Sequence, residues 1–139
     1  MPVHRAAVVH TSIHAPPDDV VGFLSDVENW KTWGPWIRAV ARSSPRDWTL
    51  ETDAGVMKVH FVESNPFGVL DHRVTLASGH TVTNGMRVIS NGTGSELVMV
   101  LFQYPGISTA EFERDIQAVT DDLARLKTAA ETIGTEHRQ

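Results

Sequence analysis

Four polar side chains of this sequence are expected to point into an otherwise apolar interior: His72, Asn84, Gln103 and Glu63. Each lies in a stretch where polar and apolar residues alternate, and each falls on the apolar side of that alternation. An imidazole can act as a general acid or base, and an amide can polarise a carbonyl group. The same groups can instead bind the oxygens of a hydrophobic ligand, or be satisfied by neighbouring backbone groups. The residue pattern leaves these interpretations open.

Other kinds of chemistry find no support in the residue pattern. The chain has no cysteine, which excludes disulfides, thiolate nucleophiles and cysteine-ligated zinc. His10 and His14 have the spacing of a helical metal-binding pair, but their segment has the pattern of a strand, where they would lie roughly 13 Å apart. No zinc-hydrolase, phosphate-loop or serine-hydrolase motif occurs. We therefore expect no metal and no cofactor, and His72 is the one catalytic candidate.

The composition favours one globular domain that spans residues 1–139. A chain of this length, 41% hydrophobic, can bury a core without disulfides. Twelve basic residues against seventeen acidic ones are the wrong balance for a nucleic-acid partner. No apolar run approaches the roughly twenty residues of a membrane span, and the N-terminus does not resemble a secretory signal. We expect a cytoplasmic protein; the sequence does not specify whether it forms a homodimer.

Strands and turns are predicted for most of the chain. Residues 3–13 are rich in valine and threonine and predict a first strand, and a helix is expected from Pro17 to about Ser25. Asp26 can cap a second short helix that carries Trp30 and Trp33. Between residues 36 and 104, five turn signals separate six further strands; they lie at 43–45, 53–55, 65–66, 77–79 and 91–92.

A long helix is predicted after Pro105 and Gly106. Ser108 and Glu111 have the spacing of a capping box. Apolar residues then follow at alternating spacings of four and three, which places them on one stripe: Phe112, Ile116, Val119, Leu123, Leu126, Ala130 and Ile133. The stripe fits packing against a half-buried sheet, with a coiled-coil seam as the alternative. The acidic residues at 115, 121 and 122 are interpreted as solvated.

This order of elements resembles the helix-grip fold of the START/Bet v 1-like (SRPBCC) superfamily. Segments 13–20 and 23–30 are similar to its A-P-x-x-V…L-x-D…W pattern, and 33–36 continues it. Segments 69–74, 86–88 and 91–96 are similar to uncharacterised bacterial members of the polyketide cyclase/dehydrase-like group. The resemblance implies an α+β fold in which a seven-stranded curved antiparallel sheet wraps a long C-terminal helix, with two short helices between strands 1 and 2. It also implies lipids, hormones, polyketides or quinones as ligands.

A curved sheet cannot close completely around one helix, so we expect a small-molecule cavity between them. Strand alternation predicts most of its wall, and the short helix that resembles the family's lid adds two tryptophans. The predicted ligand-binding residues are Trp33, Trp36, Met57, Phe61, His72, Asn84, Met86, Met99, Leu101 and Gln103. Flexible methionines suit a pocket that accepts varied shapes.

Three functions are compatible with such a cavity. The first is binding of a small hydrophobic molecule: a lipid, a polyketide or another aromatic or isoprenoid metabolite. The second is a cyclase or dehydratase in which His72 is the acid or base and Asn84 polarises a carbonyl. The third is an interaction protein whose interior is filled by its own side chains. An apolar wall with a single proton carrier favours the first, whereas two ionisable groups in hydrogen-bond contact would favour the enzyme.

Overall fold

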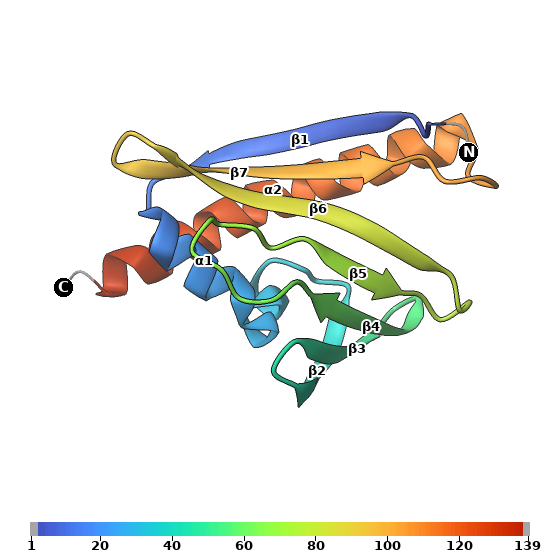
Figure 1. The fold of residues 1–139 in the computed structure, drawn as a ribbon, viewed down its shortest axis with the longest axis horizontal. Helices are drawn as coiled ribbons and strands as arrows, with labels where there is room; N and C mark the ends of the chain where they lie inside the picture. Colours follow the sequence, from blue (N-terminus) through green and yellow to red (C-terminus); the bar gives the residue numbers. More distant parts are fainter. Residues whose placement is uncertain (1–2, 138–139) are drawn as a thin grey trace.

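A seven-stranded antiparallel sheet and three helices make up the computed structural model, which describes residues 3–137 (Figure 1). The elements in chain order are β1 (Ala6–Ile13), α1 (Pro17–Ser25), the 3-10 helix η1 (Val27–Thr32), β2 (Ile37–Ser44), β3 (Asp47–Thr52), β4 (Gly55–Phe61), β5 (His72–Thr75), β6 (Thr81–Asn91), β7 (Gly94–Phe102) and α2 (Thr109–His137). The predicted α+β helix-grip architecture is confirmed, although the first strand begins at Ala6 rather than at residue 3.

The strands lie in the order β1-β7-β6-β5-β4-β3-β2, and every neighbouring pair is antiparallel. The chain therefore crosses the sheet once, between β1 and β2, and then runs back strand by strand. Figure 1 shows α2 running along the part of the sheet that β1, β7 and β6 form. The helix α1 lies beside the C-terminal half of α2. The predicted hairpin turn joins β6 to β7, where Gly92 has a φ of 58°.

The two short helices begin where the sequence predicted. Pro17 occupies the start of α1, and two aspartates occupy its first turn. The Asp26 carboxylate accepts a hydrogen bond from the Glu28 N–H at 3.1 Å and so begins η1. This second helix is 3-10 and ends at Thr32, because the N–H groups of Trp33 and Gly34 both turn back to the Trp30 carbonyl. Trp33 thus caps η1 rather than lying within it.

The apolar stripe of α2 packs into the core of the molecule. Leu123, Leu126 and Ala130 are buried together with residues of the sheet and of α1, which confirms packing on the sheet rather than a coiled-coil seam. At the start of the helix, the Ser108 hydroxyl accepts from the Glu111 N–H at 3.1 Å. The Glu111 carboxylate meets the Ser108 hydroxyl instead of its N–H, so only half of the expected capping box forms. No helix among residues 3–137 is long and apolar enough to cross a lipid bilayer.

Replacing Leu126 by alanine tests the packing of α2. The side chain is 0% exposed, so Leu126→Ala is expected to lower the free energy of unfolding by about 2–5 kcal/mol through lost burial and the cavity left behind. Urea titration followed by circular dichroism measures the change. Thr128→Ala, at an exposed position of the same helix, should change the free energy by less than about 0.5 kcal/mol. Equally small losses in both variants would contradict the packing.

Candidate functional site

A cavity of about 480 Å³ lies between the inner face of the sheet, η1 and the N-terminal half of α2. Small-molecule sites in proteins commonly enclose roughly 300–1,000 Å³, so the space can hold a ligand. Apart from a few polar groups its wall is apolar, and the sheet, η1 and α2 all contribute to it. The interior is therefore not filled by the protein's own side chains.

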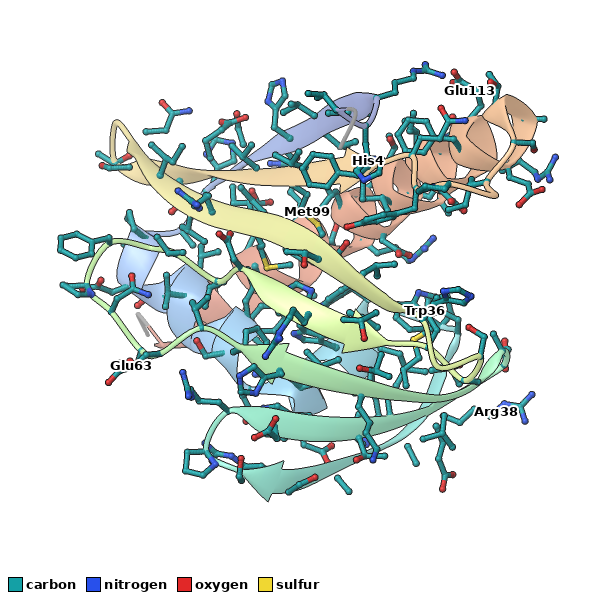
Figure 2. The ribbon with its side chains drawn as sticks, turned by 45° about the vertical axis from the view of Figure 1, so that its right-hand side comes forward. His4, Trp36, Arg38, Glu63, Met99 and Glu113 are labelled. Carbon is teal, nitrogen blue, oxygen red and sulfur yellow. The ribbon has the colours of Figure 1, made fainter. Side chains whose placement is uncertain are left out.

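Eight of the ten predicted ligand-binding residues lie on the wall of this cavity: Trp33, Trp36, Met57, His72, Asn84, Met86, Met99 and Leu101. Strand alternation explains the six of them that lie on strands; β6, for example, buries Met86 and Val88 and exposes Arg87 between them. Met99 on β7 and Trp36 after η1 are labelled in Figure 2. The structure places these residues together; that they bind a ligand remains a proposal.

Phe61, Gln103 and Glu63 do not lie on this wall. Phe61 is buried behind it, with its ring centroid 5.3 Å from that of His72. The Gln103 amide donates to the Ile107 carbonyl at 2.9 Å and is satisfied locally. Glu63 is exposed, and Figure 2 shows it at the periphery of the molecule. Gln103 and Glu63 follow the last residues of β7 and β4, where the alternation that placed them inward no longer applies.

Part of the wall was not predicted, namely the loop before α2 and one face of that helix. Tyr104 and Ile107 come from the loop, and Asp115, Val119 and Asp122 come from the helix. The expectation that Asp122 is solvated is wrong, since it is half-buried. Residues seven apart share a helix face, so the spacing of the two aspartates around Val119 carried a usable signal.

Four rings fix η1 against the sheet and form an aromatic cluster: Trp30, Trp33, Phe61 and His72. The Trp30 centroid lies 5.5 Å from those of Trp33 and His72, and 5.9 Å from that of Phe61. The Trp30 indole N–H donates to the Leu24 carbonyl at 2.9 Å, which ties the cluster to the end of α1. These contacts set the position of one side of the cavity.

His72 and Asn84 form a polar pair within the apolar wall. The Nδ1 atom of His72 lies 2.9 Å from the Leu70 carbonyl oxygen, which only accepts, so Nδ1 carries the proton. Burial lowers the pKa of the His72 imidazole, against the raising effects of the Leu70 carbonyl and of Asp71. The ring is therefore neutral at neutral pH, and its Nε2 accepts from the Asn84 amide nitrogen at 3.5 Å. Within the described part of the chain, this arrangement leaves the Asn84 carbonyl oxygen available as an acceptor.

Trp33 supplies the complementary donor. Its side chain lies on the cavity wall and is 6% exposed, and its indole N–H has no hydrogen-bond partner within the described part of the chain. A buried donor without a partner loses its hydration with nothing in return, at a typical cost of roughly 1–3 kcal/mol. A ligand that offers an acceptor atom would recover that loss.

Asp115 and Asp122 add carboxylates on the helix side of the cavity. Burial raises the pKa of both side chains, and for Asp115 the nearby Glu111 raises it further. Asp122 accepts hydrogen bonds from the Trp36 indole N–H at 3.3 Å and from Arg125 at 2.5 Å, and these lower its pKa in opposition to burial. Asp115 is exposed although it belongs to the wall, which places the mouth of the cavity beside it. Among the side chains that the structure describes, no group of three His, Asp or Glu residues could hold a metal ion.

A curved antiparallel sheet that holds a long C-terminal helix across an internal cavity defines a helix-grip protein of the START/Bet v 1-like superfamily. The chain belongs to the polyketide cyclase / dehydrase and lipid transport family, whose sequence pattern matches residues 5–131. No curated protein matches the sequence significantly.

Solved structures share the fold at low sequence identity. DynU16, a protein of the dynemicin biosynthetic locus, is 17% identical with a TM-score of 0.73; the match covers 93% of this chain and 48% of DynU16, so the chain spans about half its length. Ara h 8.0201 is 9% identical with a TM-score of 0.71, covering 92% and 98% of the two chains. A START superfamily protein from Mycobacterium smegmatis is 16% identical with a TM-score of 0.64, covering 94% and 97%. At these identities the likeness establishes the fold alone.

The buried neutral imidazole predicts how stability depends on pH. The unfolded chain binds a proton at His72 below about pH 6.5, whereas the folded chain, with its lowered pKa, does not until the pH is lower. The unfolded state then binds more protons, so the free energy of unfolding should fall as the pH drops below about 6.5 and level off above it. Urea titrations between about pH 5 and pH 8 measure this slope.

His72→Gln should flatten that slope, because it removes the titrating group. His80→Gln is the control, since it removes an exposed imidazole that lies away from the cavity. A slope unchanged by His72→Gln would show that other groups cause the acid sensitivity.

Proposed function

We propose that this protein binds a small, mainly hydrophobic molecule, such as a lipid, a polyketide or another aromatic or isoprenoid metabolite, in the cavity between sheet and helix. The observation that carries the proposal is a 480 Å³ space whose apolar wall contains only a few polar groups. Apolar walls provide most of the affinity for such ligands, and few polar groups fix their orientation. Membership in a family described by cyclisation, dehydration and lipid transport supports the same reading.

The polar groups of the wall suggest how the ligand is oriented. The Trp33 indole N–H requires an acceptor, and the Asn84 carbonyl oxygen can take a donor. A carbonyl or hydroxyl oxygen on an apolar skeleton would supply such partners. The methionines at positions 57, 86 and 99 come from three different strands and allow the wall to adapt to the skeleton.

A cyclase or dehydratase is the second candidate, because His72 holds a neutral imidazole at the cavity wall that could accept a proton. Its Nδ1 is bound to Leu70, and its Nε2 meets Asn84, which does not ionise. Among the described residues, no second ionisable side chain is hydrogen-bonded to His72. Catalysis would therefore depend on a proton carried by the substrate itself, and binding has the stronger support.

Mass spectrometry of small molecules released from natively purified protein tests the binding function. We expect a compound with an apolar skeleton and one or two oxygens, in an amount comparable to the protein. Binding of the neutral dye N-phenyl-1-naphthylamine to ligand-free protein provides a second measurement. Failure of both, with no released compound and no dye binding, would contradict the proposal.

Filling part of the cavity should weaken dye binding. Met57 is half-buried on the wall, so Met57→Trp is expected to weaken the affinity for N-phenyl-1-naphthylamine by at least about tenfold through loss of apolar volume. The dissociation constant is measured by fluorescence titration, and circular dichroism reports whether the fold is retained.

Lys58→Trp is the matched control, since it places the same ring on the exposed face of the same strand. Its affinity should stay within about twofold of the parent protein. Equal affinities of the two folded variants would show that the dye binds elsewhere.

A further inference from the structure

We propose that the cavity discriminates by charge: it accepts apolar ligands that end in an amine or a hydroxyl and excludes those that end in a carboxylate. This inference rests on the proposed binding function and narrows its ligand class. The inference is based on the unequal distribution of charge around the cavity. Both carboxylates of the wall lie on α2, and no lysine or arginine of the described residues belongs to the wall.

The deep part of the cavity offers no positive charge to an anion. His72, the one basic side chain on the wall, is 3% exposed and neutral at neutral pH, since burial lowers its pKa. Its ring proton is already donated to the Leu70 carbonyl. A carboxylate placed there would lose its hydration without gaining a cationic partner, which is among the most unfavourable burials in proteins. An anionic ligand would therefore have to keep its charged end at the mouth.

The mouth is no more favourable to an anion. Asp115 lies on the wall there, and among the described residues its carboxylate has no hydrogen-bond or ion-pair partner. It can accept a hydrogen bond from a ligand hydroxyl or attract an amine, but it repels a carboxylate. Burial and then Glu111 raise the pKa of Asp115, against the lowering effect of Arg114, so the charge on its carboxylate is disfavoured. A cationic group on the ligand would stabilise the charged form of the Asp115 carboxylate.

Two basic groups near the cavity, Arg125 and Arg5, are occupied by other partners. Arg125 donates through Nε to the Trp33 carbonyl at 2.9 Å and through Nη2 to Asp122. Arg5 lies over the Phe112 ring, 5.2 Å from its centroid, but its guanidinium is paired with Glu113 at 2.8 Å. Neither belongs to the wall. An incoming carboxylate would have to displace an existing carboxylate from one of these two. Arg114 precedes Asp115 on α2, is exposed and lies off the wall, and its charge acts on Asp115, whose pKa it lowers.

Three probes with the same alkyl chain isolate the effect of the headgroup: decylamine, decanol and decanoate. Their affinities are measured near neutral pH, below their micelle concentrations, by displacement of N-phenyl-1-naphthylamine. We expect decylamine to bind at least as tightly as decanol, and both to bind about tenfold or more tightly than decanoate. Decanoate that binds as tightly as decanol would overturn the charge selectivity alone. Binding of neither the dye nor any probe would overturn the binding function itself.

Asp115→Asn tests whether this side chain carries the discrimination. The variant should bind decanoate about threefold or more tightly than the parent protein, and decylamine more weakly, while decanol changes little. Asp121→Asn is the matched control, because it makes the same change in net charge at an exposed position of α2 that is not on the wall. Equal responses of the two variants would assign the effect to net charge and overturn the role of Asp115.

Discussion

The position of η1 determines whether the interior of this protein is a cavity or a solid core. The helix α2 packs closely on β1, at one end of the sheet, and the sheet then curves away from it through β7 to β2. The aromatic cluster fills the space next to α1 and fixes η1 there, but its rings do not extend across the remaining gap. Trp30, Trp33 and His72 of this cluster line one side of the cavity, and the sheet, the loop before α2 and α2 itself line the rest.

Uncharged polar groups and charged groups lie in different parts of this cavity. The deep groups, His72 and Asn84, are uncharged and hydrogen-bonded to each other and to the backbone, as burial in an apolar surrounding requires. The charged groups, Asp115 and Asp122, lie on the helix side, where Arg125 and solvent can reach them. Shape and apolar contact therefore act along the whole cavity, while charge acts at one end of it.

Local rules of sequence predicted the framework well, because each acts within a few residues. Pro17 located the start of α1, capping residues located η1 and α2, turn residues divided the strands, and alternation placed Met86 on the inner face. The same rule failed for Gln103 and Glu63, which lie just beyond the ends of their strands. Phe61 shows a different limit: alternation predicts an inner face, but only packing decides whether a side chain there meets the cavity or a neighbouring ring. The contribution of α2 depends on the angle at which it faces the sheet, which no strand pattern contains.

Three of the chain's four tryptophans, those at 30, 33 and 36, lie on the cavity wall. The fourth, Trp48, is buried off the wall beneath the guanidinium of Arg42, 5.1 Å from its ring centroid. Indole emission responds to the polarity around the ring, so a guest that displaces water would alter three emitters and leave one constant. The intrinsic tryptophan fluorescence of the protein would therefore report whether the cavity is occupied, with Trp48 as an internal reference.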